Sequence, residues 1–217
     1  MRTVWHIAGM GNYRDVVEEQ ADLLVDSGIY RVDVTHVGEG LDWITGQLRR
    51  RGILANLVRS DPNLQHYETF AMLHIEATAL VDPLPVLYFH TKGVSEPQDL
   101  GRVYWRRCME EFVVRRWRQN LGYLATHDAV GCNYLDSTDY RGHHFSGNFW
   151  IATAAWLRGL PDFAGYHRSG GFERYSCETW IGSTPGGRMH SLIARNVYPL
   201  DWTKWINLRT TYPVRNQ

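Results

Sequence analysis

The sequence lacks the features that would assign it to several broad classes of protein. Only two of its 217 residues are lysines, its net charge is zero, and its three cysteines are widely spaced. It contains no apolar run near the roughly 20 residues that a transmembrane helix needs, and its first residues do not form a signal-peptide pattern. A neutral chain gives no electrostatic reason to expect nucleic acid or anionic lipid as a partner. We therefore expect a cytoplasmic protein with reduced cysteines.

Several short motifs of ligand-binding and catalytic sites are absent as well. The chain has no GxGxxG, no GxxxxGK[ST], no GxSxG and no zinc-type cysteine spacing. The segment Gly9-Met10-Gly11-Asn12 contains GxG but not the third glycine. Dinucleotide binding, a P-loop and hydrolysis by a serine triad therefore have no support from motifs.

Apolar and aromatic residues are plentiful and arranged in an alternating pattern. The chain is 44% hydrophobic and holds nine tryptophans and twelve tyrosines, which suit a large core and also suit stacking on sugar or nucleotide rings. The first half predicts strands at 3–9, 30–37, 53–58 and 86–89, separated by a helix that ends at Gly28 and by helices at 41–51 and 68–81. Such alternation predicts an α/β protein with a mostly parallel sheet and helices on both faces.

The second half predicts a different mixture of elements. We expect a long helix at 103–124, a short strand at 129–134, a polar loop at 135–144, a helix at 151–160 and a loop at 165–171. Nothing resembles an internal repeat or an independent linker. The sequence therefore predicts one domain over residues 1–217, with a nucleotide-type half at 1–93 and a second half at 94–217 that closes over it.

The segment "VLYFHTKG" ends a buried strand with an unusual group of polar residues. His90, Thr91, Lys92 and Gly93 come directly after the apolar run. Ligands of open α/β sheets bind at the carboxyl ends of the strands, a glycine allows backbone amides to approach an anion, and an ammonium neutralises it. We interpret the segment as a phosphate or diphosphate site, against the simpler reading of a polar turn.

Arginines are concentrated on the predicted long helix. Arg102 and Arg106 lie near its start and near the HTKG segment, so we take them as candidates for phosphate binding. A run of charges on a helix is more often a solvated face, which is how we interpret Arg107, Arg115, Arg116 and Arg118. An RNA-binding module is a weaker alternative, because the neutral chain has no RNP or KH signature.

Carboxylates and amides in the later loops supply further candidates. Asp136 and Asp139, near His143 and His144, offer oxygen ligands for Mg²⁺ or Mn²⁺, or belong to a surface turn. Glu178, or else Glu173, is a candidate general base, against the alternatives of a helix cap or a salt bridge. The segment Ser146 to Trp150 combines a glycine for close approach, an amide and aromatic rings.

Taken together, five segments resemble a family of small glycosyltransferases from bacterial polysaccharide gene clusters, to which a glycosyltransferase domain of a chlorella virus is similar. These segments are "YFHTKG", "YWRRCMEEF", "AVGCNY", "HFSGNFWIATAAWLRGLP" and "ERYSCETWIGS". The resemblance extends from about Glu68 to Ser183. It implies a GT-A-like, Rossmann-like fold with an acceptor-binding C-terminal half, and transfer of a sugar from a nucleotide diphosphate sugar to an acceptor hydroxyl.

The resemblance also implies roles for individual residues. His90, Lys92 and Gly93 would lie along the donor diphosphate and its sugar, with Trp105 and Arg106 supporting that segment or contacting the phosphates. Asn148 and Trp150 would line the sugar pocket, and Glu178 would be the base. A nucleotide-sugar binding protein without transferase activity is the alternative within the same fold.

One expected feature of GT-A enzymes is missing. They commonly hold a divalent metal with a DxD motif after the fourth strand, and this chain has no DxD anywhere. This absence leaves two hypotheses: Lys92 with Arg106 or Arg102 replaces the metal, or Asp136 and Asp139 recruit Mn²⁺ or Mg²⁺ from another loop.

Overall fold

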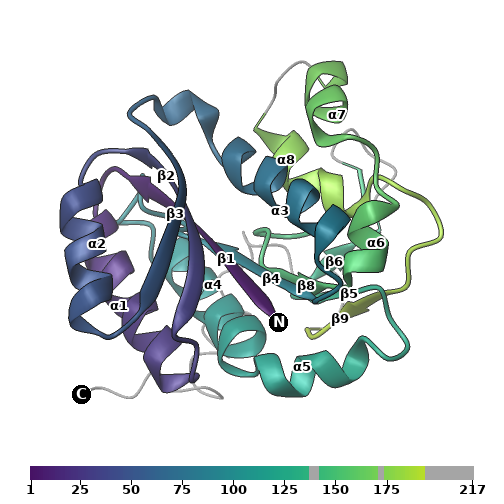
Figure 1. Cartoon of the computed structure of the whole chain (residues 1–217), viewed down its shortest axis with the longest axis horizontal. Coiled ribbons are helices and arrows are strands. Elements are labelled where there is room, and N and C mark those ends of the chain that lie inside the picture. Colours follow the sequence, from purple (N-terminus) through teal and green to yellow (C-terminus); the bar gives the residue numbers. More distant parts are fainter. Residues whose placement is uncertain (137–141, 171–173, 194–217) are drawn as a thin grey trace.

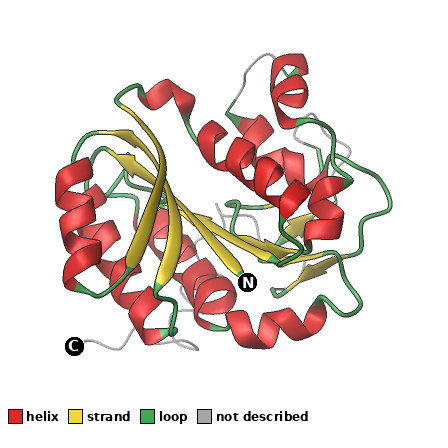
Figure 2. Ribbon diagram, viewed as in Figure 1, coloured by secondary structure: helices red, strands yellow, loops and turns green. Residues whose placement is uncertain are grey.

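The fold is built on a seven-stranded sheet with the strand order β3-β2-β1-β4-β8-β5-β9, to which both halves of the chain contribute strands. The computed structural model describes residues 1–136, 142–170 and 174–193. Helices lie on both faces of this sheet (Figure 1; Figure 2). The α/β class and the mostly parallel sheet predicted from the sequence are therefore confirmed.

The first half of the chain has the predicted alternation almost throughout. Its strands are β1 (Arg2–Gly9), β2 (Arg31–Gly38), β3 (Leu54–Asp61) and β4 (Val86–His90), with β1 parallel to β2 and β4 and β2 parallel to β3, and its helices are α1 (Tyr13–Asp26), α2 (Leu41–Arg50) and α3 (Thr69–Val81), with a 3₁₀ turn at Leu64–His66. The whole of β4 is buried, as expected for a strand covered on both faces.

The second half adds three strands to the same sheet and a separate hairpin. Its elements are α4 (Leu100–Met109), a π-helical segment (Glu110–Arg115), α5 (Trp117–Tyr123), β5 (Ala129–Gly131), β6 (Tyr134–Leu135), β7 (His144–Phe145), β8 (Trp150–Ala152), α6 (Ala154–Arg158), α7 (Phe163–Ser169), α8 (Tyr175–Thr179), a 3₁₀ turn (Trp180–Gly182) and β9 (Met189–Ser191). Strand β8 is antiparallel to both β4 and β5. It is the one strand of the sheet, in the described part of the chain, that is antiparallel to both of its neighbours.

Three predictions for the second half were wrong in part. The helix predicted at 151–160 is confirmed for 154–158, which form α6, but residues 151 and 152 belong to β8, because they pair with β4 and β5 on either side. Most of the loop predicted at 165–171 belongs to helix α7, which Asp162 caps by accepting a hydrogen bond from the Gly165 amide at 2.6 Å. The predicted long helix is also interrupted by the π-helical segment.

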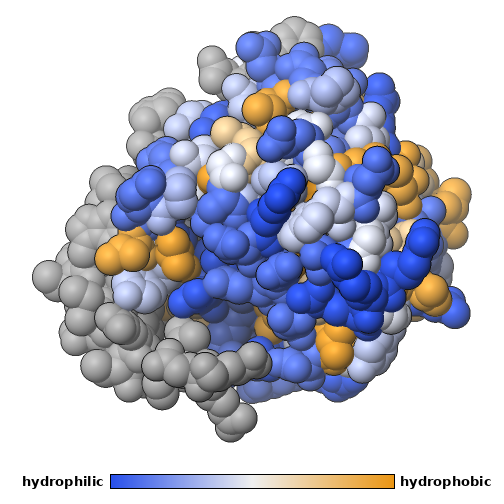
Figure 3. All heavy atoms as spheres, turned by 90° about the vertical axis from the view of Figure 1, so that its left-hand side faces the viewer, coloured by the Kyte–Doolittle hydropathy of each residue, from blue (hydrophilic) through white to orange (hydrophobic). Residues whose placement is uncertain are grey.

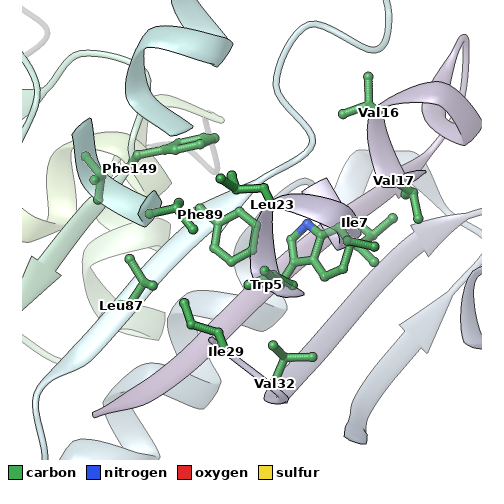
Figure 4. Close-up of a cluster of buried hydrophobic side chains, with 14 of the residues drawn as sticks. Trp5, Ile7, Val16, Val17, Leu23, Ile29, Val32, Leu87, Phe89 and Phe149 are labelled. Carbon is green, nitrogen blue, oxygen red and sulfur yellow. The ribbon is translucent and has the colours of Figure 1, made fainter. Parts of the chain in front are cut away.

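Two hydrophobic clusters, one on each face of the sheet, are formed where helices pack against it. One joins α1, α2 and α4 to residues such as Trp5, Ile7 and Phe89, and Trp5 stacks on Phe89 with ring centroids 5.4 Å apart (Figure 4). The other joins α3, α6 and α8 to residues such as Tyr88 and Trp150. The sheet is therefore the middle of three layers, with a layer of helices on each side. The loops that connect the strands to these helices meet at the ends of the strands.

The outer surface is mainly hydrophilic on the side of α1 and α2. Hydrophobic atoms occur there in separate patches (Figure 3). The edge strand β3 contributes to the exposed apolar surface, since Leu54 is 62% exposed and Leu57 is 43% exposed. In the described part of the chain, no helix combines the length and the apolar character needed to cross a bilayer.

A partly buried cluster of charged and polar side chains links the amino-terminal ends of β1, β2 and β3 to α3. Asp33 of β2 accepts hydrogen bonds from Arg2 (2.8 Å), Asn56 (2.9 Å) and His74 of α3 (2.9 Å). Burial raises the pKa of the Asp33 carboxyl, but these three hydrogen bonds outweigh it and leave the pKa well below its ordinary value. The carboxylate form of Asp33 is therefore part of the folded structure.

We expect Asp33→Asn to lower the free energy of unfolding at neutral pH by about 2 kcal/mol, because the change weakens the charged hydrogen bonds from Arg2, Asn56 and His74, while Arg2 keeps its ion pair with Asp82 at 2.8 Å. A carboxyl whose pKa is depressed by folding contributes stability above its unfolded pKa and loses it as the pH falls. The difference from the native sequence should therefore shrink below about pH 4. Urea unfolding at several pH values measures it. Asp26→Asn is the control, since the Asp26 side chain is 58% exposed; an equal loss in both variants would contradict the assignment.

Candidate functional site

The HTKG segment begins where β4 ends and is packed against the loop after β1. The Thr91 hydroxyl accepts a hydrogen bond from the Ala8 amide at 2.8 Å, and the Asn12 amide donates to the Val94 carbonyl at 3.2 Å. Gly93 has a φ of 83°, a left-handed conformation that favours glycine. The segment is thus a fixed turn at the carboxyl edge of the sheet, where the fold class places ligands.

His90 is buried and has a polar neighbour on each side of its ring. Its Nε2 lies 3.0 Å from the Gly147 carbonyl oxygen, and its Nδ1 lies 3.5 Å from Oε1 of Glu68. Burial lowers the pKa of His90 to about 3, and the nearby Lys92 ammonium contributes to this shift. The His90 side chain therefore packs beneath the HTKG segment, inside the protein, and exposes little surface to a ligand.

Glu68 is a residue of this site that sequence reasoning did not identify. Its Oε2 accepts hydrogen bonds from the Tyr88 hydroxyl at 2.9 Å and from Nδ2 of Asn148 at 2.5 Å. It immediately precedes α3, far from both partners in sequence. One glutamate at the start of a helix is ordinary, so the sequence held no distinctive signal for this role.

Lys92 and Glu178 lie close together at the carboxyl end of β4. The sequence interpretation placed both residues in one site. The Lys92 ammonium lies 3.8 Å from Oε1 of Glu178, and their side chains are 19% and 13% exposed. Glu178 is carried by α8, which is separated from β4 by most of the second half of the chain. We call Glu68, His90, Lys92, Asn148 and Glu178 the strand-end cluster.

Asn148 and Trp150 lie in the site but have no surface for direct contact with a donor. Both are completely buried. The Asn148 amide donates to Glu68 and to the Cys177 carbonyl (3.1 Å), and its oxygen accepts from Nε1 of Trp150 at 2.9 Å. The direct role in the sugar pocket predicted for these two side chains is therefore replaced by a supporting one.

Arg106 also proves to be a supporting residue. Its guanidinium is 3% exposed and forms ion pairs with Glu19 at 2.7 Å and with Glu110 at 2.8 Å. Glu110 in turn accepts a hydrogen bond from Gln20, which also donates to the His90 carbonyl at 3.0 Å. This network holds the end of β4 from the face of α1 and α4, so Arg106 is not placed to contact phosphates.

Arg102 is more accessible than Arg106. Its side chain is 43% exposed and pairs with Glu96 at 2.8 Å and Asp99 at 2.9 Å. A Cβ added at Gly93 would lie 3.3 Å from the Arg102 Cβ, so Arg102 borders the HTKG segment. Its role in phosphate binding stays a prediction.

The other arginines of this region interact mainly with carboxylates and carbonyls. Arg107 pairs with Glu19, Arg115 and Arg116 both pair with Glu111, and Arg118 donates to the Ser27 carbonyl. These contacts balance the positive charge locally and give no support to an RNA-binding face.

The predicted metal ligands are only partly described. Asp136 lies 2.8 Å from Nδ1 of His143, and its side chain is 63% exposed. Asp139 and Glu173 lie outside the described residues. Within the described ranges, no group of three or more histidine, cysteine, aspartate or glutamate side chains is arranged to hold a metal ion.

The fold can be compared with proteins of known structure. The chain is similar to a 4-diphosphocytidyl-2C-methyl-D-erythritol synthase from Anaerococcus prevotii, with a TM-score of 0.51, 11% sequence identity and 90% of each chain covered. At this identity the similarity shows the fold alone, an α/β fold with a mostly parallel central sheet. No family model matches the chain, and no curated protein matches it.

The turn that carries Asn148 depends on a glycine at position 147. Gly147 has a φ of 85°, and an added Cβ would lie 2.6 Å from both Sδ of Met109 and Nε1 of Trp105. We expect Gly147→Ala to lower the free energy of unfolding by about 2–4 kcal/mol, from backbone strain and overpacking together.

Gly46→Ala is the matched control for this prediction. Gly46 lies within α2 and has no atom within 4 Å of an added Cβ, so alanine there should raise the free energy of unfolding by about 0.4–1 kcal/mol. Chemical denaturation of the two variants measures both effects. Equal behaviour of the two would show that the turn at 146–148 is not tightly packed.

Proposed function

We propose that the protein is a glycosyltransferase that moves a sugar from a nucleotide diphosphate sugar to an acceptor hydroxyl. The observation that carries the proposal is the meeting of Lys92 and Glu178 at the carboxyl end of β4, 3.8 Å apart and both partly exposed. Glycosyl transfer to a hydroxyl needs a cation for the leaving diphosphate and a base for the acceptor, and this pair supplies one of each.

Each of the two residues has a defined part in the proposed reaction. The acceptor oxygen forms a bond to the anomeric carbon while its proton passes to the Glu178 carboxylate. The bond from the anomeric carbon to the diphosphate oxygen breaks, and its electron pair leaves with the nucleoside diphosphate. Lys92 stabilises that developing charge, which requires the ammonium to exchange Glu178 for the phosphate.

The remaining residues of the predicted donor site divide into two groups. Gly93 and Arg102 border the turn from the solvent side and are proposed to contact the diphosphate directly. His90 and Thr91 are 7% and 3% exposed, and are proposed to set the course of the backbone there. The C-terminal half, from residue 94, is proposed to bind the acceptor, because it provides Glu178.

Nucleotidyl transfer is the alternative suggested by the fold of the similar synthase. That chemistry joins a nucleoside triphosphate to a phosphate, and its nucleophile is already an anion. A carboxylate at the position of Glu178 would repel such a nucleophile, whereas a neutral hydroxyl needs a base. Glu178 therefore favours an alcohol acceptor over a phosphate acceptor.

An assay with two sets of substrates tests the proposed function. We expect nucleotide sugars to raise the melting temperature of the protein, and nucleoside diphosphate to be released when a carbohydrate acceptor is added. Pyrophosphate release from nucleoside triphosphates and sugar phosphates would instead establish nucleotidyl transfer. Stabilisation by nucleotide sugars without turnover on any acceptor would favour the simple binding protein.

Two substitutions connect this assay to the strand-end cluster. Lys92→Ala should weaken donor binding roughly ten- to hundredfold, since a charged hydrogen bond contributes about 1.5–3 kcal/mol. Glu178→Gln should leave donor binding intact and lower turnover by about 10²–10⁴-fold. The exposed residues Arg50 and Glu18 provide the controls Arg50→Ala and Glu18→Gln. Unchanged kinetics in both site variants would remove Lys92 and Glu178 from the reaction.

Metal dependence is tested separately. We propose that Lys92, assisted by Arg102, carries the charge that a metal supplies elsewhere, so turnover should persist in excess chelator. Measuring initial rates with EDTA, and again after adding Mn²⁺ or Mg²⁺, distinguishes the two hypotheses. Activity that is lost in EDTA and restored by Mn²⁺ would favour the metal-dependent alternative with Asp136 and Asp139.

A further inference from the structure

The carboxylate of Glu68 stands immediately before α3 but does not cap the helix. Its side chain makes no hydrogen bond to the first amides of α3, in keeping with the preference for shorter polar side chains at that position. Instead it is 15% exposed and turned toward the sheet. The proximity of the helix N-terminus still favours its negative charge, so the fold can keep a buried acid there for another purpose.

One oxygen of Glu68 fixes the position of α8 through Asn148. Oε2 accepts from Nδ2 of Asn148 at 2.5 Å, and the same nitrogen donates to the Cys177 carbonyl at 3.1 Å. Asn148 adopts a φ of 60°, which non-glycine residues rarely adopt without support. Because Glu178 is the next residue after Cys177, this chain of contacts sets where the Glu178 backbone lies.

The other oxygen of Glu68 meets the ring of His90. A carbonyl only accepts, so the contact of Nε2 with the Gly147 oxygen at 3.0 Å places a hydrogen on Nε2. Nδ1 then faces Oε1 of Glu68 at 3.5 Å. At this separation the Glu68 carboxylate packs against the edge of the His90 ring, so the two side chains limit each other's position.

We propose that Glu68 is the positioning residue of this site: through its contacts with Asn148 and His90 it holds Lys92 and Glu178 in register. His90 is two residues before Lys92, and Asn148 acts on Glu178 through Cys177. The inference rests on the proposed function for the chemistry of Lys92 and Glu178. Glu68 itself acts through its neighbours and contacts no substrate in this scheme.

Several charged or titratable groups surround His90 and bear on its charge. They come from β1, β4, the HTKG segment and the region of α8, and they are His6, Tyr88, Lys92, Arg174 and Glu178. His6 pairs with His90 across β1 and β4, and burial lowers the pKa of each of these two histidines to about 3. Both imidazoles are therefore neutral at neutral pH, and the contact between Glu68 and His90 is one of packing rather than an ion pair.

Kinetics of three variants test the positioning role. Glu68→Ala should lower turnover per folded molecule by about 10²-fold, the loss expected from a displacement near 1 Å. Glu68→Gln should recover most of it, because its amide can donate to Nδ1 of His90 while its oxygen accepts from Tyr88 or Asn148. Normal turnover in Glu68→Ala, or equal loss in Glu68→Gln and Glu68→Ala, would overturn the proposal.

Glu76→Ala is the third variant and the matched control for a purely structural effect. Glu76 lies on the same helix and accepts a hydrogen bond from the Phe163 amide at 3.0 Å. Its removal should lower the melting temperature and leave turnover per folded molecule unchanged. Loss of turnover in this control as well would show that stability, rather than positioning, accounts for the effect of Glu68.

Nitrogen-15 NMR of the side chains tests the positioning contacts without any substrate. The ring resonances of His90, identified by their absence in His90→Asn, should not titrate between pH 5 and 8, because burial lowers the pKa of the ring to about 3. The Nδ2 resonance of Asn148, which donates to Glu68, should shift in Glu68→Ala and stay in place in Glu76→Ala. An unchanged Asn148 resonance in Glu68→Ala, or titration of His90 near the ordinary histidine pKa, would overturn the proposal. This measurement stands even if no nucleotide sugar is turned over.

Discussion

The pairing of β8 with β4 is the constraint on which the rest of the site depends. Strand β4 has a parallel neighbour in β1 and an antiparallel one in β8, and Tyr88 pairs with Trp150. Because β8 runs in the opposite direction, the residues just before it reach the point where β4 ends. Gly147 and Asn148 therefore lie beside His90, and the contacts that fix α8 near Lys92 depend on this one reversed strand.

The polar side chains of the site differ in how far they are buried. The polar side chains of Asn148 and Arg106 are almost completely buried, and their polar atoms contact carboxylates, carbonyls or an indole. A buried polar group that lacked such partners would be costly, so these contacts fix one arrangement. Lys92 and Glu178 are held less tightly, by an ion pair of 3.8 Å, and retain some exposure. They are the side chains of the strand-end cluster best able to change partner when a ligand binds.

The sequence predicted the first half of the fold well and the second half less well, for a physical reason. Strands β1 to β4 are apolar runs separated by amphipathic helices, and this periodicity is local information. Strand β8 has three residues buried on both faces, and such a segment cannot be distinguished from a buried helix by its pattern. Helix α7 depends on the cap at Asp162 among residues that otherwise suggest a loop.

The candidate site shows the same limit. The position of Lys92 at a strand end was predictable, because parallel strands place their carboxyl ends at one edge. The resemblance to glycosyltransferases added Glu178, and the structure brings the two together. Glu68 was not predictable, since its partners Tyr88 and Asn148 are distant in sequence. Arg106 and Asn148 were assigned to the correct region, but whether a polar side chain faces a ligand or a buried carboxylate depends on packing.

The charge of the Lys92–Glu178 pair bears on how the proposed reaction can proceed where a DxD motif is missing. Two aspartates with a divalent cation are neutral together, and so is one lysine with one glutamate. Either arrangement therefore brings positive charge to a diphosphate as part of a neutral group, and an unpaired charge in a partly buried site would be costly. The two arrangements differ once the donor has bound. A metal stays with its aspartates, whereas Lys92 must leave Glu178 to bind the phosphate. Under the proposed function, binding of the donor releases the carboxylate that the acceptor needs, so the donor should bind first.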